Sequence, residues 1–195
     1  MARSKEFDPE AALDRAMGVF WSKGYEATSL DDLCDATGLN RSSLYGTFES
    51  KRVLYFRSLE RYARSGTAHL ARQLKHQSDK QAFANLIQSL IDDIVAGPGR
   101  RGCFIGNCSA ELARRDRRAA DRVRAGLRSI ETTFAAALER ARERGELHVD
   151  TDVAGLARYL TSGIQGLRLV GKANPDRENL EDIAKWILRA FDSPA

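Results

Sequence analysis

Residues that interrupt helices are scarce in this chain. Its 195 residues include four prolines, Pro9, Pro98, Pro175 and Pro194, and each stands near an expected turn or chain end. Proline inside a helix removes a hydrogen bond and clashes with the preceding turn, so its scarcity favours helices, as do the many Ala, Leu, Arg and Glu residues. No segment alternates apolar and polar residues as a strand would, and no internal repeat is visible. The sequence therefore predicts an all-α protein.

Cysteines and long apolar runs are also lacking. The three cysteines, Cys34, Cys103 and Cys108, are an odd number and too few for a disulfide framework, which favours a reducing cytoplasm. No stretch approaches the roughly 20 apolar residues of a membrane span, and the first residues lack the apolar segment of a secretory signal. We therefore expect a cytoplasmic protein with no membrane partner.

The signatures of common enzyme classes are absent as well. The sequence contains no GxSxG, no P-loop and no GxGxxG. His69, His76 and His148 share no metal-ligand spacing with one another or with the cysteines, and scattered histidines are more often surface or capping residues than ligands. We expect no enzymatic activity, no metal site and no cofactor.

Charge is distributed unevenly along the chain. The apolar fraction of 43%, the charged fraction of 30% and the net charge of +4 suit a globular protein that is able, but not obliged, to bind nucleic acid. Residues 1–64 carry ten basic and ten acidic residues, whereas residues 100–128 carry nine arginines against three acids. Such an arginine run is most simply a solvated helix face. A DNA-binding surface in the first 64 residues must therefore use local charge.

Three short helices are predicted before Ser50. The first begins at Asp8-Pro9, carries apolar residues on one face and ends at Gly24. The second opens at Ser29, with Asp32 as a capping partner, and ends at Gly38. The third spans roughly residues 41–48 after a capping Asn40.

The rest of the chain also has helical periodicity. Ser50 caps a longer helix, and apolar residues three and four apart mark further helices over roughly 83–94, 107–114, 116–145, 153–170 and 180–191. We expect about nine helices, arranged as a small head over residues 1–50 and a larger domain over residues 51–195.

The most informative stretch runs from Ser29 to Lys51. Helix, glycine-containing turn and helix within this length form a helix-turn-helix pattern. Arginine can pair with guanine, and serine or threonine can meet base edges or phosphates. Lys51 starts a helix, where a cation is unfavourable unless it faces phosphate. The outward residues of the second helix are Arg41, Ser42, Ser43, Tyr45 and Thr47. A purely structural three-helix bundle has the same spacing, so spacing alone leaves the two interpretations nearly even.

The run from Phe20 to Leu54 resembles the DNA-binding domain of the TetR/AcrR family of transcriptional regulators. The matching positions are Phe20, Gly24-Tyr25, Thr28-Ser29-Leu30, Ala36-Thr37-Gly38-Leu39, Ser43-Leu44-Tyr45, Phe48, Lys51 and Leu54. The sequence departs from the family at Ser42, where glycine is common, and at Thr47, where histidine is frequent. These departures concern which operator is read.

The resemblance implies a homodimer that binds double-stranded operator DNA. Arg41, Ser42, Ser43, Tyr45 and Thr47 are then expected in the major groove, and Thr28, Ser29, Tyr45 and Lys51 on phosphates. Arg3 and Lys5 precede the head and are most simply a solvated tail. The last two helices are expected to pair with their copies through Gly163, Ile164, Leu167, Ile183 and Ile187.

The resemblance also implies a repressor that a small-molecule effector releases from its operator. Ligand sites are mostly apolar with a few polar groups. The expected lining is Phe83, Ile87, Phe104, Phe134 and Tyr159, with Asn107, Gln165 and Arg168 as polar contacts. No acidic or basic residue stands out on these apolar stripes, so we expect a neutral or weakly polar ligand, apolar or aromatic in character. For each residue alone, a place in a tight core is the simpler explanation.

Two other interpretations remain open. Cys103 and Cys108 lie in a GCFIGN-type segment that occurs in a subset of TetR-like regulators, some of which sense electrophiles or oxidants through cysteine, although two buried thiols are the simpler explanation. The other interpretation, from a different class, is a helical protein-interaction module that does not bind DNA. Operator binding and sensitivity to thiol-blocking reagents distinguish these possibilities.

Overall fold

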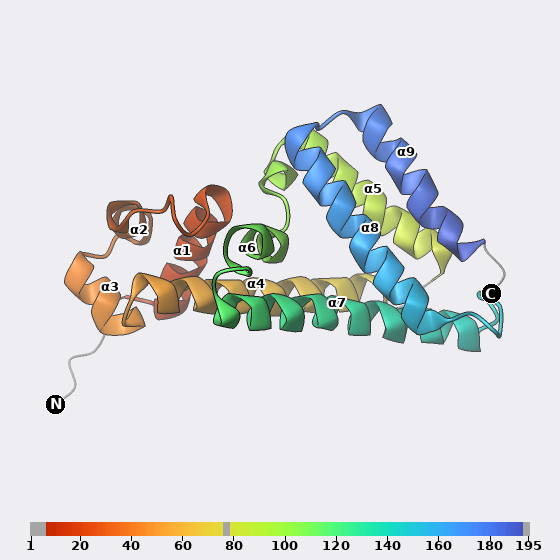
Figure 1. Cartoon of the computed structure of the whole chain (residues 1–195), viewed down its shortest axis with the longest axis horizontal. Helices are drawn as coiled ribbons and strands as arrows, with labels where there is room; N and C mark the ends of the chain where they lie inside the picture. The colour runs from red at the N-terminus through yellow and green to blue at the C-terminus, as the bar shows by residue number, and fades with distance from the viewer. Residues whose placement is uncertain (1–6, 76–78, 193–195) are drawn as a thin grey trace.

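The computed structural model describes residues 7–75 and 79–192, and over these residues the chain is helical with no strand (Figure 1). The elements are α1 (Pro9–Lys23), α2 (Leu30–Thr37), α3 (Arg41–Phe48), α4 (Lys51–Gln73), α5 (Lys80–Ala96), α6 (Phe104–Leu112), α7 (Arg117–Glu143), α8 (Val153–Ala173) and α9 (Arg177–Leu188). Short 3-10 turns follow α5 (η1, Pro98–Arg101) and α9 (η2, Arg189–Phe191). The expected all-α class is confirmed.

Local capping explains where the N-terminal helices begin. The side chains of Asp8, Ser29, Asn40 and Ser50 each accept a hydrogen bond from a backbone N–H in the first turn of α1, α2, α3 and α4, respectively. The capping box of α2 is complete, because Asp32 also accepts from the Ser29 backbone N–H at 2.9 Å. These predicted caps are confirmed.

The helix in the GCFIGN segment begins earlier than predicted. It starts at Phe104 instead of Asn107, because Phe104, Ile105 and Cys108 turn together into the core. Asn107 does not cap this helix; its side-chain Nδ2 donates to the Arg101 carbonyl oxygen at 2.9 Å. Burial of one apolar face thus extends the helix toward its N-terminus beyond the predicted range.

Two apolar cores divide the molecule. The head core joins α1, α2, α3 and the first half of α4 to α6 and the start of α7, and it is centred on Phe20, Tyr55 and Phe104. The body core joins α5, α8 and α9 to the second half of α7. The long helices α4 and α7 run side by side between the two (Figure 1). The head therefore does not end structurally at Ser50, since its core extends into α6; a functional boundary at residue 50 stays a prediction.

Among residues 7–75 and 79–192, no helix combines the length and the apolar character that a membrane span requires.

Candidate nucleic-acid interface and adjoining cavity

Helix α3 presents a polar surface on a rigid base. Leu44 and Phe48 are buried beneath it and hold it against the head core. Arg41 and Ser42 are exposed, and Ser43, Tyr45 and Thr47 are half-buried at the same surface. Arg41 is loosely paired, with 3.8 Å between its guanidinium and the Asp31 carboxylate and 68% of its side chain exposed. This helix can therefore offer hydrogen-bonding groups to a ligand without disturbing the core.

A second polar group lies where α4 begins. The Lys51 ammonium sits 4.6 Å from the centre of the Tyr25 ring, which fixes the cation near the turn between α1 and α2. Ser29 is exposed at the start of α2. These residues surround the ends of helices whose first N–H groups attract anions. Tyr25 did not belong to the expected contact set, although it lies inside the family-like run.

The position of Thr28 contradicts the expectation that its side chain contacts phosphate. Its side chain is buried, and its hydroxyl donates to the Gly24 carbonyl oxygen at 2.5 Å. The hydroxyl is used to close the turn after α1, so it does not face a ligand.

The acid in the α2 capping box is fixed as a carboxylate. Hydrogen bonds from Lys23 and from Ser29 lower the pKa of Asp32 to about 2. The Lys23 ammonium lies 2.5 Å from this carboxylate and ties the end of α1 to the start of α2. The first two helices of the head are thus joined by a polar contact as well as by their core.

Helix α6 holds the head through a carboxylate that the sequence did not reveal. Glu111 accepts hydrogen bonds from the backbone N–H groups of Tyr25 at 2.9 Å and Glu26 at 2.8 Å. At the other end of α6, the Trp21 indole N–H donates to the Gly102 carbonyl oxygen at 3.0 Å. We call these contacts the α6 clamp. They connect the turn before α2 to the segment that borders the cavity described next.

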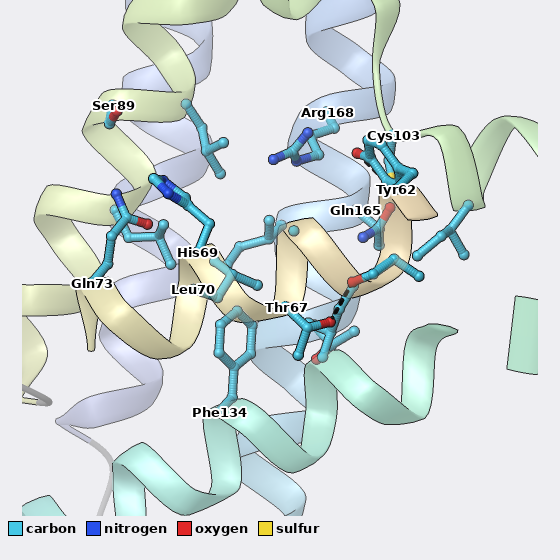
Figure 2. Close-up of a pocket in the computed structure, with 18 of the residues that line it drawn as sticks. Tyr62, Thr67, His69, Leu70, Gln73, Ser89, Cys103, Phe134, Gln165 and Arg168 are labelled. Carbon is cyan, nitrogen blue, oxygen red and sulfur yellow. Dashed lines mark hydrogen bonds between the residues drawn. The ribbon is translucent and has the colours of Figure 1, made fainter. Parts of the chain in front are cut away.

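A cavity of about 190 Å³ lies between α4, α5, α7 and α8, next to the start of α6 (Figure 2). Of the expected ligand contacts, Phe134, Gln165 and Arg168 line it, and Cys103 lines it as well. Its polar residues also include His69 and Thr67 on α4, which the expected lining did not contain.

The other expected ligand contacts lie elsewhere. Phe83 and Ile87 are buried in the body core, where the Phe83 ring packs 5.3 Å from that of Phe134. Phe104 belongs to the head core, and Tyr159 is 46% exposed on the outer face of α8. Asn107 borders a surface groove between α1, α6 and α8, which shares Gln165 and Arg168 with the cavity. Apolar periodicity located these helices but did not tell core positions from cavity positions.

The two cysteines of the GCFIGN segment have different surroundings. Cys108 is completely buried in the head core, and burial raises the pKa of its thiol. Cys103 borders the cavity, and the Tyr62 hydroxyl lies 3.8 Å from its sulfur. Only Cys103 of this pair is placed to meet a small molecule.

The expected dimer contacts are mostly internal. Ile164, Leu167 and Ile187 are buried within the subunit, and Gly163 allows close packing of Ile187 against α8. Ile183 is half-buried against the body core. These residues already have partners within the chain, so the expectation that they form a subunit interface is corrected for all but Ile183.

A different apolar face is open on the last two helices. Leu169 and Tyr159 on α8 and Trp186 on α9 are exposed by 70%, 46% and 65%, respectively. Gly166, between the two α8 residues, has no neighbouring atom where a side chain would begin. We call Tyr159, Gly166, Leu169, Ile183 and Trp186 the α8–α9 face.

Four residues from the sequence analysis lie outside the described ranges, namely Arg3, Lys5, His76 and Pro194. Within those ranges no group of three or more His, Cys, Asp or Glu residues is arranged to hold a metal ion.

The sequence of this chain matches two family models and is similar to known proteins along most of its length. Residues 12–57 match the family described as bacterial regulatory proteins of the tetR family, and residues 80–187 match a tetracyclin repressor-like C-terminal domain. The uncharacterized HTH-type transcriptional regulator YezE of Bacillus subtilis is 34% identical over 98% of this chain and 100% of its own length. The HTH-type transcriptional repressor ComR of Escherichia coli is 34% identical over 97% of this chain and 91% of its own.

A solved structure has a fold similar to that of this chain over nearly its whole length. It is a cysteine mutant of the TetR family regulator CifR in complex with 26-bp double-strand operator DNA, with a TM-score of 0.85 and 27% identity, covering 97% of this chain and 100% of its own. The matched proteins are regulators and not enzymes, and an interaction module that does not bind DNA is excluded. This chain is a DNA-binding transcriptional regulator and belongs to the TetR family.

Proposed function

We propose that this protein is a homodimeric repressor that binds a palindromic operator through α3 and leaves it when a small molecule enters the cavity. The observation that carries the proposal is the exposed polar surface of α3, which stands on buried Leu44 and Phe48 beside Lys51. Arg41 is the best placed residue to read a base, because its guanidinium is exposed at the first turn of α3.

Local charge, not net charge, supports DNA binding by the head. Residues 1–64 carry equal numbers of basic and acidic residues. Asp32 is paired with Lys23, and both Asp14 and Glu10 pair with Arg61 away from α3. Lys51 has no carboxylate partner among the described residues and is held near helix ends that favour phosphate. ComR, named a repressor, and CifR, bound to operator DNA, support the same function here.

The α8–α9 face supports a dimer. Burying a large apolar side chain contributes roughly 1.5–3 kcal/mol, and aromatic residues dominate many protein interfaces. Trp186 and Leu169 present such side chains to solvent in a single subunit. A two-fold interface across these helices buries both and sets the distance between two copies of α3. Recognition helices bind half-sites about 34–36 Å or a multiple apart.

The α6 clamp supplies the connection between cavity and head. Cys103 and Ile105 border the cavity at the start of α6, and Glu111 near its end holds the turn before α2. A ligand that fits a shifted α6 better than the resting one favours heads with altered spacing. Since operator and ligand then prefer different conformations, each weakens the binding of the other.

Selection of bound sequences from random duplex DNA tests the proposal at moderate salt. We expect an enriched palindrome whose half-sites are separated by one helical turn or a multiple of it. The variant Arg41→Ala is expected to relax preference at one position in each half-site. Recovery of no enriched motif by the wild-type dimer would contradict the proposal.

A cysteine sensor is a second candidate for the same cavity. Cys103 borders the cavity whereas Cys108 is enclosed in the head core. In this mechanism the Cys103 sulfur adds to an electrophilic carbon of a quinone, and its proton passes to the reduced ring. Operator release by a quinone should then be lost in Cys103→Ser and kept in Cys108→Ser. Release that survives in both variants rules out this sensor.

A further inference from the structure

Arg168 differs from every other half-buried arginine in the described ranges. Arg61, Arg122 and Arg142 form ion pairs with carboxylates; Arg140 donates to carbonyl oxygens, and Arg101 stacks on Trp21 and donates to a carbonyl oxygen. Arg168 makes no hydrogen bond or ion pair with any described residue, although it is half-buried on α8 and borders the cavity. A half-buried guanidinium without a protein partner keeps its donors free for water or for an anion that enters the cavity.

Gln165 lies one turn before Arg168 on the same face of α8. Its side-chain amide also has no hydrogen-bond partner among the described residues, and its oxygen approaches Gly106 at the start of α6. Figure 2 shows Arg168 and Gln165 toward one end of the cavity and Phe134 and Leu70 toward the other. The cavity therefore has a polar end with unused donors and an apolar end with an aromatic ring.

The charges around the polar end favour an anion. Arg72 and Arg101 border the opening beside Arg168, and the one acid among the residues lining this opening and the cavity is Asp93. Asp93 is exposed on α5 and forms no ion pair with Arg168. Three guanidinium groups thus face one carboxylate, and an entering anion meets a net positive charge.

We propose that the effector is a small carboxylate with a ring or branched apolar tail. Its carboxylate pairs with the fork of Arg168 and accepts from the Gln165 amide, while its tail packs on Phe134 and Leu70. The size fits a single ring, since a cavity of about 150 Å³ accommodates benzene and this one is about 190 Å³. The inference rests on the proposed ligand-responsive function and replaces the neutral ligand expected from the apolar stripes.

Calorimetry on the full-length, DNA-free protein tests the inference with benzoate and its neutral analogue benzamide. Loss of a charge-assisted hydrogen bond weakens binding on the order of tenfold to a hundredfold, so benzoate should bind more tightly than benzamide by about that factor. Arg168→Gln should abolish the difference, and Arg168→Lys should keep part of it. Arg158→Gln is the matched control, because Arg158 lies on the same helix, is exposed and does not border the cavity.

Three outcomes overturn the inference. They are equal binding of benzoate and benzamide to the wild type, retention of the preference in folded Arg168→Gln, and no binding of benzoate, cyclohexanecarboxylate or butyrate at millimolar concentration. Circular dichroism melting of each variant identifies those that are folded. Operator release is measured separately, so binding of benzoate without release contradicts the proposed function and leaves the ligand class standing.

Discussion

The head and the body of this protein differ in how far their packing is determined by residues that lie close together in the sequence. Each short helix of the head begins at a polar cap, and Leu44 and Phe48 alone anchor the outward face of α3. In the body, α8 is apolar on more than one side, with Leu160 and Leu167 inside and Leu169 outside. Caps and short apolar stripes therefore identify the exposed surface of a head helix from local sequence, whereas the buried side of a helix with two apolar sides is set by its neighbours.

The largest expected effects come from placing a charge on the exposed side or on the buried side of α8 and α9. Leu169→Asp places a charge on the exposed α8–α9 face and should give folded monomers, whereas Ile187→Asp buries a charge in the body core and should unfold the protein. Operator affinity of the Leu169 variant should fall on the order of a hundredfold to ten-thousandfold, because two linked heads become one.

Analytical ultracentrifugation and thermal melting check this pair of variants. Ala154→Asp, also exposed on α8 but in its first turn and away from the α8–α9 face, measures the effect of an added charge by itself. A dimeric Leu169→Asp protein with normal operator affinity would show that the subunits meet elsewhere.

The outward face of α3 should give the next largest effect. Arg41→Ala is expected to cost about 1–3 kcal/mol of operator binding per half-site, since the variant cannot form the bidentate arginine–guanine pair. The thermal midpoint should stay unchanged, because the side chain is exposed and its contact with Asp31 is long. Competition binding with single-base operator variants checks whether discrimination disappears at one position only; uniform weakening at every position would instead make Arg41 a phosphate-binding residue.

Much of the head could be predicted from sequence because its determinants are close along the chain. Ser29 and Asp32 form their capping box within one turn, and Gly38 ends α2 in a left-handed conformation that glycine adopts at little cost. Thr28 was misjudged because its hydroxyl reaches back to Gly24, an option that the pattern of polar residues does not reveal.

The arrangement of the helices in the body depends on contacts between residues that are far apart in the sequence. The sequence analysis expects Ile164 and Leu167 of α8 at the subunit interface, yet both are buried inside the subunit and Leu169 of α8 is exposed instead. Likewise, Glu111 accepts hydrogen bonds from Tyr25 and Glu26, which precede it by 86 and 85 positions in the sequence. No local pattern distinguishes Glu111 from a solvated acid. Its role becomes visible only when α6 is packed against the head.

The α6 clamp joins the two regions, and Glu111→Gln should loosen it. A neutral acceptor replaces two charge-assisted hydrogen bonds, which are about twice as strong as neutral ones. Amide hydrogen exchange of Tyr25 and Glu26 should quicken on the order of tenfold, given a loss of about 1.4 kcal/mol. Asp35→Asn is the control, because it neutralises an exposed acid of the head that makes none of the clamp contacts. Unchanged exchange in Glu111→Gln would show that the clamp does not restrain the head.

Lys51 tests whether the neutral head relies on local charge. Lys51→Ala should weaken binding to all DNA sequences alike and reduce the slope of log affinity against log salt by ~1 for each phosphate that the protein no longer neutralises. The matched variant Lys75→Ala lies beyond the end of α4 and should leave the slope unchanged. A slope that does not change in Lys51→Ala would place this cation away from phosphate.

The smallest expected effect concerns the capping box at the start of α2, where pH replaces mutation as the probe. Asp32 has a folded-state pKa of about 2, below its ordinary value of 3.8, because Lys23 and Ser29 hydrogen-bond to the carboxylate. A carboxylate whose pKa is depressed by folding stabilises the folded state above its unfolded pKa and loses that contribution as pH falls through the folded pKa. Stability should therefore decline between about pH 4 and pH 2, in part because of this group. Because the Asp32–Lys23 pair lies at the surface, the decline from this one carboxylate should be modest and smaller at high salt.

Urea unfolding of the wild type and Asp32→Asn across this pH range measures this contribution to stability. The asparagine variant should be less stable near neutral pH and should show a shallower dependence on pH, and two parallel curves would mean that other carboxylates account for the whole acid transition.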